Sequence, residues 1–200
     1  MNRLTRLTFV LLSIAILSVA HFSQAAAKAE GNFDIVLQVL IGSDTRNIGG
    51  QMPQNLAAVS RQLKVNYSFN ELRLANTYVG RISNGGNFEF KSVSNLFGRD
   101  AANDRPSFLE WSLSGLKVEN KEPIKSEVGL QVFRFGARIP IITGQSKDGD
   151  GKVISIYNYE NVGLTSTRIA MAENVPTLLG SLSLPNSDSS MFLILTLRPA

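Results

Sequence analysis

The sequence predicts a mainly β fold with one early helix (α+β), namely an antiparallel sheet or β-sandwich preceded by a β-α-β element. Three observations support this prediction. Val, Ile, Thr and Phe are abundant beside 16 glycines, and this composition favours strands and turns. Roughly eight or nine runs alternate between apolar and polar residues or are continuously apolar, as strands do. One segment near the start has a helical period instead.

Residues 1–27 have the three parts of a secretory signal peptide. Two arginines precede an apolar segment over residues 7–22, and small residues follow at Ala25 and Ala27. This order is typical of an export signal. An uncleaved anchor is the alternative, but it would need about 20 apolar residues. We therefore expect cleavage near Ala25 or Ala27, no transmembrane span after cleavage, and a single β-rich domain over residues 28–200.

The side-chain inventory excludes several kinds of catalysis. The sequence has no cysteine, and its one histidine, His21, lies in the predicted signal peptide. The mature chain therefore lacks disulfides, thiol chemistry, His- or Cys-based zinc sites and a histidine base for a nucleophile. Ser-x-x-Lys occurs at residues 114–117, but it lies in a strand-like run and lacks the Lys-Thr-Gly partner of penicillin-binding enzymes. We expect no enzymatic activity, cofactor or metal residues.

The first predicted element is a strand over residues 32–42. Every second residue from Phe33 to Ile41 is apolar, so this face is expected to be buried. Val36 and Leu40 lie on the other face, which indicates that this face is partly covered as well.

A helix and a second strand complete the β-α-β element. The helix is predicted over residues 52–65, with Pro53 in its first turn. Its apolar face consists of Leu56, Val59 and Leu63. The second strand is predicted over residues 67–82, and the residues expected on one of its faces are Leu72, Leu74 and Tyr78.

The middle of the chain predicts a hairpin and a strand that changes face. Residues 83–87, Ser-Asn-Gly-Gly-Asn, form a hairpin turn signal, and the next strand places Phe88 and Phe90 in phase. Over residues 108–119 the apolar positions are first Leu109, Trp111 and Leu113, and then Leu116 and Val118. This switch of parity predicts a β-bulge at Gly115.

Four more strand-like runs follow, over residues 128–143, 152–171, 175–184 and 189–199. The last run is apolar or β-favouring from Met191 to Leu197 and carries no charge in that span. Such a run would template aggregation if it lay at an exposed edge. We therefore expect an interior strand paired on both sides. The predicted faces are Leu193 with Leu195, and Phe192 with Ile194.

Residues 148–151, Asp-Gly-Asp-Gly, are compatible with a calcium loop or with a tight turn. A calcium loop of the EF-hand type that began at Asp148 would place Lys152, Val153 and Tyr159 where a ligand, a glycine and a glutamate are needed. The strand-like flanks and the Asp-Gly pair favour a hairpin tip instead. A weak calcium contact through Asp148 and Asp150 would remain compatible with this hairpin.

Two groups of charged residues are candidates for a site. Paired carboxylates serve glycosidases, and the candidates are Glu89, Glu110 and Glu160, which lie in strand-like runs. Basic residues interleaved with aromatics can bind nucleic acid. They are Lys117, Lys121, Lys125, Arg134 and Arg138, with Phe133 and Phe135. Because acidic residues stand among these lysines, we expect a solvated sheet face and no nucleic-acid partner.

Residues 153–199 resemble the C-terminal part of the secretin β-domain, found in the ring-forming outer-membrane channels of type II secretion and type IV pilus systems. The matching motifs are a tyrosine-rich strand that leads into Val162-Gly163-Leu164, then Leu179-Gly180-Ser181-Leu182, and a closing strand that ends in Thr196-Leu197-Arg198-Pro199. The long gate segment of secretins is missing, and Ser181 replaces a glycine. The resemblance therefore implies a related β fold and not a channel.

These observations predict an exported, non-catalytic β-rich protein that mediates protein–protein interaction. Its location would be periplasmic or extracellular, with outer-membrane association as one form. The secretin resemblance suggests an accessory of a secretion or pilus system. A carbohydrate- or small-ligand-binding module is the alternative. The sequence does not identify the protein partner or the oligomeric state.

Overall fold

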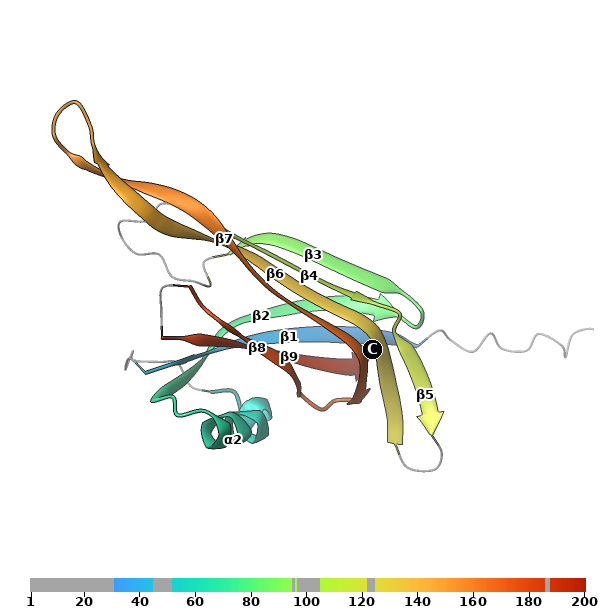
Figure 1. Cartoon of the computed structure of the whole chain (residues 1–200). Coiled ribbons are helices and arrows are strands. Elements are labelled where there is room, and N and C mark those ends of the chain that lie inside the picture. The colour runs from blue at the N-terminus through green and yellow to red at the C-terminus, as the bar shows by residue number, and fades with distance from the viewer. Residues whose placement is uncertain (1–30, 45–51, 95, 97–104, 122–124, 186–187) are drawn as a thin grey trace, which may run out of the picture. The chain divides into compact units, whose positions relative to one another are not determined.

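Two antiparallel sheets and one helix make up the computed structural model, which describes residues 31–44, 52–94, 96, 105–121, 125–185 and 188–200 (Figure 1). The predicted signal peptide, residues 1–27, lies outside the described residues. The mainly β class with one early helix is confirmed by nine strands, a helix and a short 3-10 turn in this part of the chain. Residues from Asn32 to Ala200 form one compact unit.

Sheet A has four strands in the order β2-β1-β9-β8. Their bounds are Asn32–Ser43 for β1, Glu71–Ser83 for β2, Thr177–Ser183 for β8 and Ser190–Pro199 for β9. The helix follows a 3-10 turn, η1 (Gln54–Leu56), and is α2 (Ala57–Asn66). It connects β1 to β2, which pair antiparallel. The predicted β-α-β element is therefore part of sheet A.

Sheet B contains the other five strands. Its central strand is β6, which pairs with β4 and β5 along one edge and with β7 along the other edge. β3 (Asn87–Ser94) pairs with β4 (Ser107–Ser114) at one edge. β5 (Lys117–Lys121) continues the line of β4 beside β6 (Lys125–Lys147). β7 (Val153–Ala172) pairs with β6 along almost its full length.

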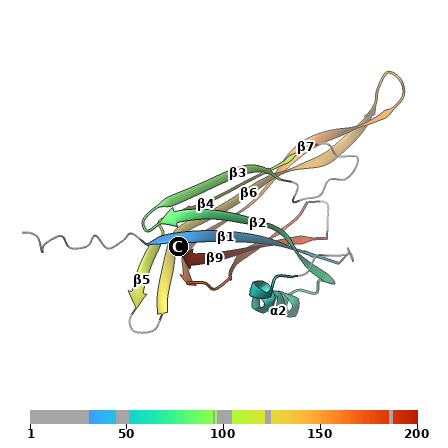
Figure 2. The ribbon, with the colours of Figure 1, turned by 180° about the vertical axis from the view of Figure 1, so that it is seen from behind.

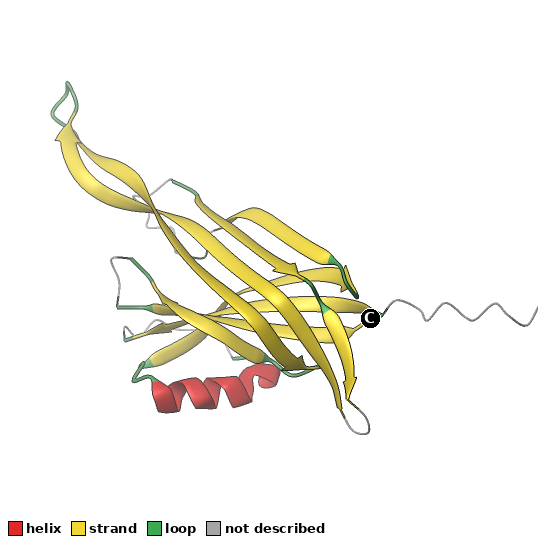
Figure 3. Ribbon diagram, turned by 45° about the vertical axis from the view of Figure 1, so that its right-hand side comes forward, coloured by secondary structure: helices red, strands yellow, loops and turns green. Residues whose placement is uncertain are grey.

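The main core lies between the two sheets. Alternate residues of β1 from Phe33 to Ile41 are buried in it, as the period of two predicts. Sheet B contributes Leu109, Trp111, Leu113, Phe133 and Phe135 to the same cluster. This face-to-face packing gives two layers of sheet (Figure 3).

A second apolar cluster joins α2 to the outer face of sheet A (Figure 2). The helix contributes Val59 and Leu63 and the preceding turn contributes Leu56, so the predicted apolar face is confirmed. Leu40, Phe192 and Ile194 of the sheet complete the buried part of this cluster. The helix therefore covers part of the outer face of sheet A. Among the described residues, no helix combines the length and apolar character needed to cross a membrane.

The last strand is an interior strand, as predicted. β9 pairs with β1 on one side and with β8 on the other. Leu193 and Leu195 lie in the core between the sheets, and Phe192 and Ile194 lie under α2. All four side chains are fully buried. The continuously apolar or β-favouring sequence from Met191 to Leu197 therefore correctly predicted a strand that is covered on both faces.

The prediction that Leu72, Leu74 and Tyr78 share one face is wrong. Val39 of β1 pairs with Asn76, but its neighbour Leu40 pairs with Leu74, so Ala75 is an extra residue in β2. Such a bulge moves the residues on either side of it to opposite faces. Leu72 and Leu74 pack against the helix-side cluster, and Tyr78 lies in the core between the sheets.

The turn at Ser83–Gly86 is present, but it does not form the predicted hairpin. The Gly86 N–H donates to the Ser83 carbonyl at 2.9 Å, and Gly85 has a φ of 79°. However, β2 belongs to sheet A and β3 to sheet B. The turn therefore carries the chain from one layer to the other. The two edges come close, since a Cβ on Gly80 would lie 2.4 Å from the Phe88 ring.

The change of face at Gly115 is confirmed, but the predicted β-bulge is wrong, because no residue is inserted. Ser114 pairs with Val132 and Lys117 with Gly129, which leaves two residues on each strand between these pairs. The switch is made by backbone conformation, because Gly115 has a φ of 66°, which glycine adopts readily. Arg168 on β7 has a φ of 55°, and the core residues of β7 likewise change parity between Leu164 and Ile169.

Candidate functional site

The β6–β7 hairpin extends beyond the strands that flank its base (Figure 1). The pairing of β4 with β6 ends at Phe108 and Arg138. From there to the tip, residues 139–147 of β6 pair with residues 153–160 of β7 and, among the described residues, with no further strand. We call these two segments the projecting hairpin. A two-stranded ribbon by itself is marginally stable in water, and here Arg105 lies over the ring of Tyr157 in β7.

The projecting hairpin exposes apolar side chains on both faces. Ile154 and Ile156 share one face by the period of two, and they are 50% and 51% exposed. Val153 lies on the other face, 53% exposed, as does Ile142, which is 52% exposed and pairs with Tyr157. Neighbouring exposed β-branched residues of this kind mark contact surfaces more often than scattered single ones do.

The two free edges of the projecting hairpin differ. β6 carries Pro140 and a bulge in which Thr143 is the extra residue, and both features discourage pairing with another strand. The facing segment of β7 has no proline, and Glu160 is its only charged residue. The β7 edge is therefore the less protected of the two.

The tip at Asp148–Gly151 is a turn closed by hydrogen bonds within the chain. The Asp148 N–H donates to the Lys152 carbonyl at 2.9 Å, and the Gly151 N–H donates to the Asp148 carbonyl at 3.0 Å. The Asp148 carboxylate accepts from the N–H groups of Asp150 and Lys152 at 3.1 and 2.8 Å. The hairpin prediction is confirmed. The described residues contain no cluster of three or more His, Cys, Asp or Glu that could hold a metal.

Replacement of both turn carboxylates, Asp148→Asn with Asp150→Asn, is expected to change the melting temperature by no more than about 2 °C. The amide oxygen of the replacement side chain at position 148 can accept the same two hydrogen bonds, and the turn needs no ion. Thermal unfolding with and without millimolar calcium checks this. A large stabilisation of the wild type by calcium that is lost in the double variant would contradict it.

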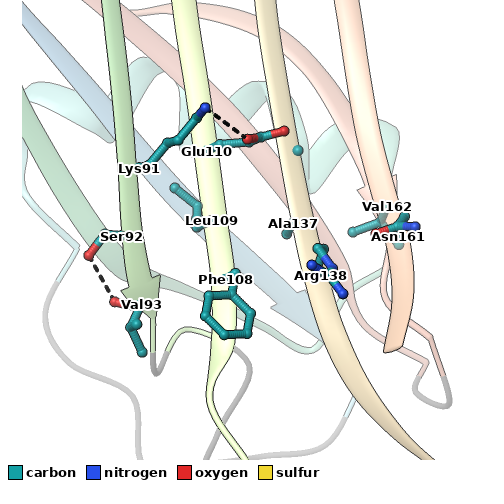
Figure 4. Close-up of a pocket in the computed structure, with 11 residues that line it drawn as sticks. Lys91, Ser92, Val93, Phe108, Leu109, Glu110, Ala137, Arg138, Asn161 and Val162 are labelled. Carbon is teal, nitrogen blue, oxygen red and sulfur yellow. Dashed lines mark hydrogen bonds and ion pairs between the residues drawn. The ribbon is translucent and has the colours of Figure 1, made fainter. Parts of the chain in front are cut away.

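A trough lies on the solvent-facing side of sheet B, over β3, β4, β6 and β7. It consists of three adjoining hollows that share lining residues, and the largest has a volume of about 650 Å³ (Figure 4). The strand register arranges its side chains in rows across the sheet. The rows are Val93-Phe108-Arg138-Asn161, Lys91-Glu110-Gly136-Gly163 and Glu89-Ser112-Arg134-Thr165. Gly136 and Gly163 leave the middle of the trough open, because they carry no side chain.

Lys91 brings two of the predicted carboxylate candidates together. Its Nζ lies 2.8 Å from a carboxylate oxygen of Glu89 and 4.0 Å from one of Glu110. The hydrogen bond to Glu89 and the charges of Glu89 and Glu110 raise the pKa of Lys91 above its ordinary value. All three groups are exposed. Glu160, the third carboxylate candidate, lies on the projecting hairpin and is not part of this network. The trio is an ion-pair network at the surface, which stabilises the fold little.

Arg138 lies over two aromatic rings at one end of the trough. Its guanidinium carbon is 5.3 Å from the ring centre of Tyr159 and 5.9 Å from that of Phe108. The two rings are themselves 5.9 Å apart, and the Tyr159 hydroxyl donates to the Pro106 carbonyl at 3.1 Å. These contacts hold a guanidinium beside an exposed aromatic surface.

The aromatic candidates and the Ser-x-x-Lys motif do not have the surroundings that their predicted roles need. Phe133 and Phe135 are buried in the core, so they cannot stack on a base beside the neighbouring arginines. Ser114 ends β4 and Lys117 begins β5, with Gly115 and Leu116 between them, so the Ser-x-x-Lys motif does not lie at the start of a helix. Sequence reasoning did not assign Gly136 to a site, and it noted Gly163 only within the motif Val162-Gly163-Leu164. The one signal at Gly136 is that it interrupts a run of strand-forming residues.

No protein-family model matches this chain, and no curated protein matches it in sequence. The resemblance of residues 153–199 to secretins therefore stays a prediction, and function is inferred from the geometry and composition of the chain.

Proposed function

We propose that this chain is an exported, non-catalytic protein that binds another protein through its projecting hairpin. The observation that carries this proposal is the exposure of Ile142, Val153, Ile154 and Ile156 on both faces of one hairpin. A folded partner that covered this hairpin would bury apolar area worth roughly 25 cal/mol per Å².

Export and the absence of catalysis rest on composition. Residues 1–27 follow the plan of a signal peptide, and the chain that remains has neither histidine nor cysteine. The segment that resembles secretins, residues 153–199, includes the β7 strand of the hairpin. This favours a partner in a secretion or pilus assembly.

The size of the native complex tests this function. Tagged wild-type chain in gently lysed cells of its own host is expected to elute in sizing chromatography well above its own mass. Ile154→Thr with Ile156→Thr should elute as the free chain, because both changes remove apolar contact area and keep β-branched residues. Val65→Thr with Val79→Thr is the matched control, since these residues are 85% and 66% exposed elsewhere. A wild-type profile without a partner, or equal profiles for both variants, would contradict the proposal.

A second candidate function is the binding of a carbohydrate or small ligand at the trough. The observation that favours it is a hollow of about 650 Å³ with an exposed aromatic ring and several polar side chains. Binding sites for small molecules have volumes of about 300–1,000 Å³ and combine apolar surface with a few placed polar groups. This function uses the face of sheet B and does not depend on the projecting hairpin tip.

A further inference from the structure

We propose that the trough binds an acidic oligosaccharide, with Arg138 and Arg134 as the partners of its carboxylates. This inference rests on the second candidate function, ligand binding at the trough, and names the class of ligand. It is independent of protein binding by the projecting hairpin.

The charges of the trough favour an anion with more than one carboxylate. Lys91 is held by Glu89 and Glu110, and Arg81 at the edge of sheet A is paired with Asp34 at 2.8 Å. Within the described part of the chain, Arg134 and Arg138 form no ion pair. A guanidinium presents a planar set of donors that matches a carboxylate. The two arginines are four residues apart on β6, which places their Cα atoms about 13 Å apart along the strand.

The rest of the largest hollow matches the surface of a sugar. Phe108 is 40% exposed and offers an apolar ring at the end where Arg138 lies. Asn161, Lys91 and Glu110 line the same hollow, so hydrogen-bond donors and acceptors are both present. A sugar ring likewise has an apolar face and a rim of hydroxyl groups that donate and accept. Figure 4 shows Phe108, Arg138 and Glu110 around this hollow.

The form of the trough favours a chain of sugars over a compact molecule. The three hollows follow β4 from Phe108 to Ser114, a length of about 20 Å at the usual rise of a strand. One arginine lines the hollow at one end, and the other lines the remaining two hollows. A polymer with recurring carboxylates can reach both arginines at once, whereas a single anion reaches one.

Calorimetric titration of the full exported chain with trigalacturonate tests this inference. The wild type is expected to bind it, and Arg138→Gln to weaken binding about tenfold, which is the effect of losing one charged hydrogen bond. Gly136→Val should weaken binding by a similar factor, because its side chain would fill the hollow. The new Cβ would be 3.4 Å from Glu110, an ordinary contact, so the fold should be retained. Arg61→Gln on α2 is the control and should bind as the wild type does.

Three further results separate the alternatives. Equal binding of fully methyl-esterified trigalacturonate would overturn the acidic class but leave ligand binding at the trough intact. Tighter binding of a triglutamate peptide would overturn the inference in favour of an acidic protein. Absence of binding to both sugars, or binding unchanged in Arg138→Gln and Gly136→Val, would overturn the inference together with the second candidate function. If the projecting hairpin binds a protein partner as proposed, these variants should leave the size of the native complex unchanged.

Discussion

Leu195→Ala is expected to lower the free energy of unfolding by about 2–5 kcal/mol, the usual range when a buried leucine is truncated. Leu195 is fully buried in the core between the sheets. Its strand neighbours are Leu37 on β1 and Thr177 on β8, so the space it leaves is walled by ordered strands and cannot collapse easily. Domains are stable by roughly 5–15 kcal/mol. The variant should therefore unfold at clearly lower urea concentration and become sensitive to protease.

The matched control for this variant is Val79→Ala on β2, where the side chain is 66% exposed. Its stability should change by no more than about 0.5 kcal/mol. If Leu195→Ala kept the stability of the wild type and lost only assembly, β9 would be an edge strand completed by a partner subunit. That result would contradict the position of β9 between β1 and β8.

Gly80→Val is expected to cost about 1–3 kcal/mol through overpacking. A Cβ at this position would lie 2.4 Å from the Phe88 ring, where the edges of the two sheets approach each other. The ring has little room to move, because its centre is 4.8 Å from that of Trp111, which is itself buried. Urea unfolding measures the loss.

A double variant distinguishes steric overlap with the Phe88 ring from a general effect of valine at position 80 on the strand. Phe88→Leu should recover part of the stability lost in Gly80→Val, because the shorter side chain leaves room for the new methyl groups. Gly144→Val is the control within β6, since a Cβ there would approach no atom closer than 3.8 Å. If Gly80→Val were as stable as this control, the two sheet edges would not be in contact at Phe88.

The sequence predicted those elements correctly whose burial or turn type depends on residues that are neighbours in the chain. β1 and β9 were predicted correctly because full cover on one or both faces leaves an apolar pattern in the strand itself. The tip at Asp148–Gly151 was predicted because Asp-Gly between two strand-like runs suits a tight turn. These features need no knowledge of distant parts of the chain.

The wrong predictions have a common physical cause. In each case, pairing or packing between distant segments determines the local structure. Ala75 is small enough to fit at either face, so the sequence gives no sign of the bulge that moves Leu74 and Tyr78 to opposite sides. The turn after Ser83 suits a hairpin as well as a crossing between sheets, and the packing of Phe88 over Gly80 selects the crossing. At Gly115, neighbouring strands change face together, so no extra residue is needed.

The trough could not be predicted from the sequence because it forms across four strands. Glu110, Gly136 and Gly163 come from distant parts of the chain and meet only through the register of β4, β6 and β7. Arg138 is one of several basic residues in the sequence, but its position over Phe108 and Tyr159 depends on the same pairing. The exposure of Ile154 and Ile156 could not be predicted either. The sequence around them resembles a buried strand, and only the tertiary structure places them on the projecting hairpin.

Site-specific photo-crosslinking in living cells tests protein binding by the projecting hairpin most directly. A photoreactive amino acid is placed at Ile154 in one variant and at Val65 on α2 in another, since both positions are exposed. We predict one discrete adduct from position 154, with a partner that mass spectrometry can identify, and none from position 65. A lack of any adduct at position 154, or the same adducts from both positions, would contradict the proposal that the hairpin is the binding element.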